Sequence, residues 1–301
     1  MSFSSETKAE LCRTPMTKPC CVQAELYGAL LYCNTFTHRE LRVVTEHASF
    51  AQRLERLLHR AAGISPERRS GEEGSGKIIL GLRDPAALEK LCSLYGMELD
   101  RSPSHHINLG VLEEDCCRVS FLRGAFLAGG SITDPGKGYH MEFITSHYSV
   151  AREAAAILRE LGFKPGELAR NGNYVIYFKQ SEIIEDLLTT LGAPLAAMEI
   201  MSTKVEKEIT NKVNRRMNCD QANLDKVVNA AQDQLKAIRS LETQGKLKGL
   251  SPKLQETARL RLENPELSLS QLADIASPPI SKSSLHHRLK KLMEMAEEHE
   301  E

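Results

Sequence analysis

The sequence predicts an α+β fold built from a duplicated half and followed by an all-helical domain. Three observations predict it: one block of the chain recurs 96 residues later, each copy alternates helical and strand patterns, and helical patterns alone fill the last third. Strands mixed with helices, some of them joined as hairpins, indicate a sheet that helices cover on one side. The length of 301 residues suits two or three domains.

The duplication shows as a common offset at both ends of the repeat. Residues 20–36 recur as 116–132, and residues 77–96 recur as 173–192, so 96 positions separate the copies at each end. A middle block recurs with an offset near 99. The matched pairs include Cys20 with Cys116, Cys21 with Cys117, Gly28 with Gly124 and Gly96 with Gly192. A period this long exceeds those of solenoid repeats and indicates a duplicated domain half.

Each copy predicts the same five elements in the same order. Apolar residues at helical spacing predict the helices, and short apolar runs predict the strands. The first copy comprises a helix at 22–34, a strand at 40–46, an amphipathic helix ending at Gly63, a strand at 78–82 and a helix ending at Gly96. The second comprises a helix at 118–130, a strand at 140–145, an amphipathic helix ending at Gly162, a strand at 174–178 and a helix ending at Gly192. Gly63 and Gly162 suit the left-handed position that follows a helix.

The helix at 121–130, FLRGAFLAGG, resembles the LAGLIDADG helix of homing endonucleases. In that family, two such helices pack at a pseudo-twofold axis, and an acid at the eighth motif position of each binds the catalytic metals. Counted from Leu127, the eighth position of the second copy is Asp134, whereas the same offset in the first copy gives His38.

A lone Asp134 predicts a protein without nuclease activity. Two-metal phosphodiester hydrolysis needs carboxylates on both sides of the scissile group, because hard divalent cations want oxygen ligands. The run Asp134–Pro135–Gly136 instead indicates a turn. The alternative is an active LAGLIDADG-type homing endonuclease that uses Asp134.

Eight cysteines offer no CxxC pair, so their spacing predicts neither a zinc knuckle nor a thioredoxin motif. The two CC doublets could indicate metal or redox chemistry. The interpretation favoured here is small buried thiols kept reduced, with no metal and no cofactor.

Charge is uneven along a chain whose net charge is −1. Residues 1–203 carry 22 Lys and Arg against 25 Asp and Glu, whereas residues 204–292 carry 17 against 10. The chain ends with five acids, Glu294, Glu297, Glu298, Glu300 and Glu301. A basic C-terminal third favours a polyanionic partner. The expected domains are 1–203 (copies at about 20–100 and 116–200), a basic linker at 204–221, and a helical domain at 222–301 with a helix-turn-helix at about 268–293.

The basic linker contains candidate DNA contacts. Arg and Lys neutralise phosphates, and Asn can bond phosphate or base edges. The candidates are Asn214, Arg215, Arg216 and Asn218. The alternative is a polar interdomain connector. A helix is expected next, at 222–242, with an apolar face made of Leu224, Val227, Val228, Ala231, Leu235, Ile238 and Leu241.

The end of the chain resembles a helix-turn-helix similar to that of sigma-factor region four. Ser268 or Ser270 is expected to cap a short helix that carries Ile275, and Ser281 to cap a second one. The second helix would bury Leu285, Leu289 and Leu292 and expose the candidate DNA contacts Ser281, Lys282, Ser283, Ser284, His286, His287, Arg288, Lys290 and Lys291. The early serines are expected near base edges, the late lysines near phosphates, and His287 and Arg288 near either. The alternative is an ordinary amphipathic helix pair.

The order of these parts resembles the WhiA family, with the segment NRRMNCDQANL as its most specific portion. The resemblance implies a bacterial transcription regulator linked to sporulation, cell division and chromosome segregation, without nuclease activity. It also implies that promoter DNA binds mainly to the helix-turn-helix. The N-terminal domain would then have a regulatory role or contact other transcription or division proteins. No run of 18 apolar residues and no signal peptide is found, so a cytoplasmic, nucleoid-associated protein without membrane contact is expected.

Overall fold

The computed structural model describes residues 2–70, 76–97 and 105–297. The chain divides into two compact units, Met1–Lys207 and Glu208–Glu301, and each unit has its own hydrophobic core. Of the predicted acidic end, Glu298, Glu300 and Glu301 lie outside the described residues.

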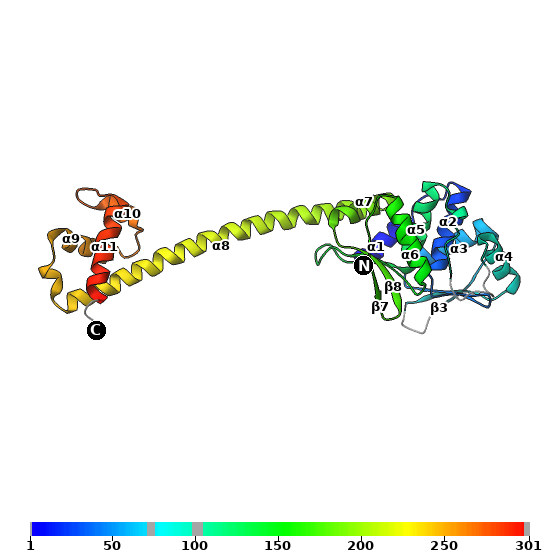
Figure 1. Ribbon diagram of the computed structural model, residues 1–301, viewed down its shortest axis with the longest axis horizontal. Coiled ribbons are helices and arrows are strands. Elements are labelled where there is room, and N and C mark those ends of the chain that lie inside the picture. The colour runs from blue at the N-terminus through cyan, green and yellow to red at the C-terminus, as the bar shows by residue number, and fades with distance from the viewer. Residues whose placement is uncertain (1, 71–75, 98–104, 298–301) are drawn as a thin grey trace. The chain divides into compact units, whose positions relative to one another are not determined.

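The first unit consists of one N-terminal helix and two copies of the same helix and strand order (Figure 1). Helix α1 (Phe3–Leu11) comes before the first copy. The first copy contains α2 (Pro19–Leu31), β1 (Thr35–Phe36), β2 (Leu41–Thr45), α3 (Ala48–Ala62), β3 (Glu67–Ser70), β4 (Ile78–Leu82) and α4 (Pro85–Tyr95). After a short 3₁₀ turn (Leu109–Val111), the second copy contains α5 (Asp115–Gly129), β5 (Gly130–Ile132), β6 (Met141–Thr145), α6 (Tyr148–Glu160), β7 (Gly166–Arg170), β8 (Asn173–Phe178) and α7 (Ser181–Leu191).

The strands form two antiparallel sheets of the same topology. Their orders are β1-β2-β4-β3 and β5-β6-β8-β7. The register is also shared: Leu41 faces Leu82 in the first sheet, and Met141 faces Phe178 in the second. Helices lie on one side of both sheets in Figure 1, and the apolar residues of β2 and β6 that face them are buried. The α+β class with helices on one side of a duplicated sheet is therefore confirmed.

The predicted glycines at the helix ends are confirmed, but the structure also contains two edge strands that the sequence analysis did not predict. Gly63, Gly96 and Gly192 lie in the left-handed region at the ends of α3, α4 and α7, and Gly162 does so just beyond α6. Strands β3 and β7 were not expected, because their side chains are largely exposed and show no apolar alternation.

The second copy contains an insertion between its first two strands. Phe36 and Ile132 are 96 positions apart, as at the start of the repeat, but their strand partners Leu41 and Met141 are 100 apart. Four residues link β1 to β2, and eight link β5 to β6. The middle offset is thus 100 at β2 and β6 and returns to the expected 99 at Gly63 and Gly162, and Asp134 lies inside the longer loop.

Helices α2 and α5 cross with their backbones in direct contact, at Gly28 and Gly124. A Cβ at Gly28 would lie 2.0 Å from the Phe121 carbonyl oxygen, and one at Gly124 would lie 1.9 Å from the Glu25 carbonyl oxygen. Both obstacles are backbone atoms, which cannot rotate away. Only glycine, whose side chain is a hydrogen atom, therefore allows this crossing. The crossing joins the two copies into a single core.

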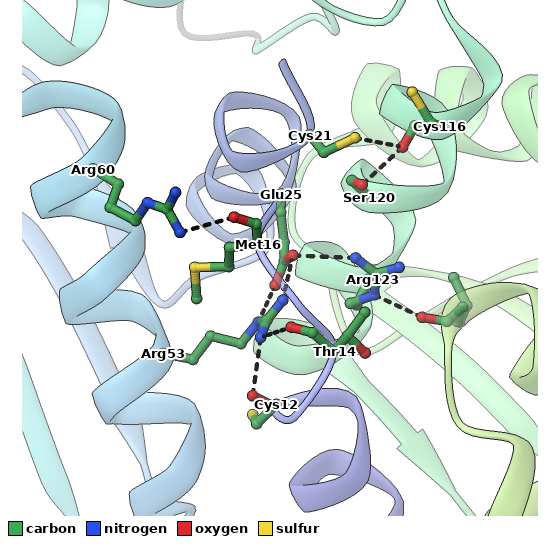
Figure 2. A network of polar contacts seen from close by, with 11 residues as sticks. Cys12, Thr14, Met16, Cys21, Glu25, Arg53, Arg60, Cys116, Ser120 and Arg123 are labelled. Atoms are coloured by element: carbon green, nitrogen blue, oxygen red, sulfur yellow. Dashed lines mark hydrogen bonds and ion pairs between the residues drawn. The ribbon is translucent and has the colours of Figure 1, made fainter. Parts of the chain in front are cut away.

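A buried ionic cluster lies beside the crossing (Figure 2). The Glu25 carboxylate of α2 accepts two bonds from the Arg53 guanidinium of α3, one of them 2.8 Å long, and lies 3.3 Å from Nη1 of Arg123 on α5. Arg53 also donates to the carbonyls of Cys12 and Thr14, at 2.9 and 2.7 Å. Since Arg53 and Glu25 are almost fully buried, this shared geometry satisfies charges that would otherwise be costly to desolvate.

Helix α8 (Pro194–Thr243) replaces the expected linker and shorter helix with one continuous element. Its start is capped in the first unit, where the Glu10 carboxylate accepts the amides of Leu195 and Ala196 at 2.7 and 2.9 Å. No glycine or proline occurs from 195 to 244, so nothing in the sequence stops the helix before Gly245. The expected apolar face is buried at Ala231, Ile238 and Leu241. Leu235 is half-buried, whereas Leu224, Val227 and Val228 are exposed, which corrects the N-terminal half of that prediction.

The second unit packs the end of α8 with a 3₁₀ turn (Lys246–Gly249) and three helices. These are α9 (Pro252–Glu263), α10 (Leu269–Ile275) and α11 (Lys282–Glu297). Its core includes Ile238 of α8, Ala258 of α9, Leu272 of α10 and Leu289 of α11.

We expect Gly124→Ala to destabilise the first unit by about 3 kcal/mol or more, because the added methyl group must push two helix backbones apart. Urea denaturation followed by circular dichroism measures this loss. Gly138→Ala is the matched control, since a Cβ there meets nothing within 4 Å. Equal stability of the two variants would contradict the close crossing.

Candidate nucleic-acid interface

Helix α11 begins at a side-chain cap and buries one narrow face. The Ser281 hydroxyl accepts the Ser284 amide at 3.2 Å, as the sequence predicted. Leu285, Leu289 and Leu292 are at most 1% exposed, which confirms the buried side. This spacing leaves the rest of the helix circumference to polar residues.

Helix α10 is held against α11 by its own cap and by the connecting turn. Ser268 rather than Ser270 is the cap, and it forms a capping box with Gln271. Within the turn, the Ile280 amide donates to the Ala273 carbonyl at 3.1 Å. Ile275, expected on the apolar side of this helix, is 49% exposed and lies outside the core.

Every predicted α11 residue reaches the surface. Ser284 and Arg288 are half-buried, and the exposed ones are Ser281, Lys282, Ser283, His286, His287, Lys290 and Lys291. Lys290 forms an ion pair with Glu294 one turn later, at 3.5 Å. Exposed pairs of this kind contribute less than about 1 kcal/mol, so Lys290 can exchange the carboxylate for a phosphate.

A pocket of about 210 Å³ at the start of α11 adds residues that the sequence analysis missed. Its polar lining includes Lys226 of α8, Arg261 of α9, Ser270 of α10 and Lys282 of α11. Arg261 is 2% exposed and donates to the Leu267 carbonyl at 2.7 Å. Burial lowers the pKa of this guanidinium from its usual value. The helix pattern alone could not bring these four elements together.

The basic stretch of α8 is wholly exposed from 208 to 221, whereas Lys204 and Lys207 before it are half-buried. Asn214 and Asn218 lie one turn apart on the same side of the helix, and Arg215 and Arg216 follow Asn214 directly. The segment is thus a helical surface rather than an irregular connector.

Asp134 lies in a turn and not in the motif helix. Its carboxylate accepts the Gly136 amide at 2.7 Å, and its carbonyl accepts the Lys137 amide at 2.9 Å. The turn that the sequence indicated is confirmed. Since α5 ends at Gly129 and β5 follows, a motif running from Leu127 to Asp134 is wrong.

The glycine crossing sets the correct motif register. Gly28 and Gly124 occupy the third position of Leu26–Tyr27–Gly28 and Leu122–Arg123–Gly124, so the eighth positions are Cys33 and Gly129. Neither is an acid.

Neither of the eighth positions provides a ligand for a catalytic metal ion. A Cβ at Gly129 would lie 2.5 Å from the Ile144 carbonyl oxygen, which leaves no room for a carboxylate. The Cys33 thiol donates to the carbonyls of Leu30 and Thr35, and burial raises its pKa to about 12. Cys33 is therefore a protonated thiol near neutral pH.

The CC doublets differ from the expected buried thiols, because they form one cluster that is partly exposed. The sulfur atoms of Cys20, Cys21, Cys116 and Cys117 all lie within 4.8 Å of one another. Only Cys117 is buried, and Cys20 is exposed. Spacing along the chain could not show this cluster, because it is formed by two copies 96 residues apart.

The outward faces of both sheets carry charges that are largely paired. In the first sheet, Arg69 pairs with Glu67 at 2.7 Å and Arg83 with Glu40 at 2.9 Å. In the second, Glu142 lies 3.7 Å from Arg170. These pairs neutralise part of the positive charge that the two faces carry.

A duplicated LAGLIDADG-like unit without paired motif acids, joined to a helix-turn-helix, defines the class of this protein. Residues 118–210 match the WhiA LAGLIDADG-like domain, and residues 213–296 match the WhiA C-terminal HTH domain. The chain belongs to the WhiA family.

Relatives cover the whole chain. The probable cell division protein WhiA of Ruminiclostridium cellulolyticum is 37% identical over 99% of this chain and 97% of its own length. That of Desulforudis audaxviator is 36% identical over the same shares. The crystal structure of full-length DUF199/WhiA from Thermatoga maritima shares the fold, with a TM-score of 0.61, 24% identity and 99% coverage of both chains. Within the described residues, no helix is long and apolar enough to span a membrane.

We expect Lys290→Ala with Lys291→Ala to weaken binding to specific and random DNA in similar proportion. Lost phosphate contacts act on every sequence and lower the salt slope by about one unit each. Titrations at several salt concentrations measure both effects, and Lys246→Ala with Lys248→Ala removes the same charge from the 3₁₀ turn as a control. Loss of specific binding alone would show that this end of the helix reads bases.

Ser284→Ala should have the opposite signature. A side chain near the start of a helix in the major groove contacts base edges, and its loss costs roughly 1–3 kcal/mol at one base pair. The order of affinities for single-base variants of a bound fragment should change while the salt slope stays the same. A changed salt slope with intact base preference would reverse the assumed orientation of α11.

Proposed function

We propose that this chain is a sequence-specific, non-catalytic DNA-binding regulator of transcription that acts in cell division. The observation that carries the proposal is α11, a capped helix whose uncovered surface presents three serines and Lys282 at its start, then two histidines and an arginine, and then two lysines. Polar groups at the start and cations along the body suit a helix that enters the major groove between two phosphate backbones.

The division of labour follows the charge of the two units. The second unit contains the cations of α11 and the exposed basic residues of α8 from 208 to 221, whereas the sheets of the first unit pair many of their charges internally. We therefore assign most of the affinity for promoter DNA to α11, with Asn214, Arg215, Arg216 and Asn218 as additional phosphate or base contacts. The first unit would act in regulation or contact other transcription or division proteins.

The absence of nuclease activity is part of the same proposal. Cys33 and Gly129 stand where paired carboxylates would be needed, and Asp134 is engaged in the turn of an inserted loop. An endonuclease that uses Asp134 is disfavoured, because the eighth motif positions, Cys33 and Gly129, provide no second carboxylate for the metal ions.

The link to cell division rests on the names of the relatives, which are probable cell division proteins. A regulator of that process would act on the bacterial nucleoid. Genome-wide DNA occupancy of the full-length protein tests this proposal: binding should concentrate at promoters, including those of division genes. Uniform occupancy would contradict sequence-specific regulation.

We expect Arg215→Ala with Arg216→Ala to reduce the affinity of the full-length chain for a promoter fragment and to lower the salt slope by up to about two units. Arg68→Ala with Arg69→Ala is the matched control on the first sheet, where both arginines already have carboxylate partners. Fluorescence anisotropy titrations compare the two double variants. A larger loss in the sheet variant would move the main interface to the first unit.

Supercoiled plasmid incubated with the wild-type protein and Mg²⁺ or Mn²⁺ should remain uncut, because two-metal hydrolysis lacks its carboxylates. Asp134→Ala should bind DNA with unchanged affinity. Gel electrophoresis of the plasmid and a parallel binding titration provide the two readouts. Metal-dependent cutting that disappears in Asp134→Ala would establish the endonuclease alternative.

A further inference from the structure

The four clustered cysteines are two equivalent pairs, one from each copy of the duplicated half, and the two pairs lie next to each other. Cys20 and Cys21 occupy the first turn of α2 after Pro19, and Cys116 and Cys117 occupy the first turn of α5. Because α2 and α5 cross at Gly28 and Gly124 with their N-termini at the same end, each doublet contributes its thiols to a shared point.

We propose that Cys20, Cys21, Cys116 and Cys117 bind one zinc ion through four thiolates. The chemistry of the donors supports this, since soft thiolate ligands select zinc among the common divalent ions and four of them complete a tetrahedral structural site. Metal binding here involves no redox change: each thiol that becomes a ligand releases a proton to solvent, up to four protons for each zinc ion.

The spacing of the sulfur atoms fits a single ion. A tetrahedral site with zinc–sulfur bonds of about 2.3 Å places its sulfurs about 3.8 Å apart. The four sulfurs here all lie within 4.8 Å of one another, so small side-chain rotations close the site. An iron–sulfur cluster needs a wider frame, because its irons and sulfides lie between the protein ligands.

Positive charge lies on both sides of the cluster. The N-termini of α2 and α5 place their partial positive charges beside the four sulfurs. The Lys18 ammonium lies 3.9 Å from the Cys116 sulfur. These positive charges offset the net charge of −2 that four thiolates and one Zn²⁺ would carry.

The backbone holds both sides of the cluster in place. The Cys21 thiol points at the Cys116 carbonyl, 3.6 Å away, and the Ser120 hydroxyl donates to the same carbonyl at 2.7 Å (Figure 2). Cys20 is exposed, so an ion can enter from solvent. Zinc at this point would tie the first turns of the two crossing helices, and with them the two copies.

Cobalt substitution in the full-length protein tests the proposal. The chain is purified with reductant, stripped with a chelator and titrated with Co²⁺, and Zn²⁺ is then added. We expect one equivalent of Co²⁺ to give the visible absorption of tetrahedral cobalt with the near-ultraviolet thiolate-to-cobalt band, and Zn²⁺ to remove both. The protein as purified should contain one zinc per chain.

Cysteine variants identify the ligands. Cys20→Ser should weaken Co²⁺ binding at least about 10-fold, since loss of even outer-shell support costs that much. Cys116→Ser should do the same, whereas Cys219→Ser, an exposed cysteine of α8, should bind like the wild type. If Cys116→Ser fails to fold by circular dichroism, the exposed Cys20 decides alone.

Three results would overturn the proposal. They are a folded, reduced wild-type protein that takes up no Co²⁺, a Cys20→Ser spectrum identical to that of the wild type, and a purified protein that carries iron and inorganic sulfide instead of zinc. The chelator should also lower the Tm of the wild type and leave that of Cys20→Ser unchanged, and equal lowering in both would count against the site.

Discussion

The contact of two helix backbones at Gly28 and Gly124 is the constraint on which the first unit depends. Neither position tolerates a Cβ, since each would lie only 2.0 or 1.9 Å from a carbonyl oxygen, far inside van der Waals contact. The crossing fixes the register of the two copies. It brings Glu25 of one copy within reach of Arg123 of the other, and it places two CC doublets at one end of the helix pair.

The same crossing explains why the catalytic end of the fold is inert. With α2 and α5 in this register, the positions that would hold metal-binding acids are the half-buried Cys33 and Gly129, which lies against the Ile144 carbonyl. Replacing these residues one at a time would not restore a site, because the backbone of β6 occupies the space of the second carboxylate. The crossing of α2 and α5 is present, but the carboxylates that would bind metal ions at its end are absent.

Much of this architecture could be predicted from the sequence, for physical reasons that differ between elements. Apolar residues at helical spacing located α3, α6 and α11, and glycines in the left-handed region located the ends of α3 and α6. The edge strand β3 (Glu67–Ser70) was not predicted, because its sequence ERRS contains no apolar residue and all four side chains are exposed. The candidate surface of α11 followed from its buried leucines. Lys226 and Ser270 did not, because a pocket between four helices depends on packing that no single pattern records. The motif register failed because LAG occurs at Leu127–Gly129 as well as in degenerate form at Leu122–Gly124, and only the helix contact distinguishes them.

Helix α8 has its first amides capped by a residue nearly two hundred positions earlier in the chain. Glu10, on the first helix of the protein, accepts the amides of Leu195 and Ala196, which have no partner within their own helix. The first dozen residues are thus structurally tied to the helix whose far end packs into the core of the second unit. A change that removes or displaces α1 would uncap that helix, so an affinity tag or a fluorescent label that disturbs α1 would also disturb the start of α8.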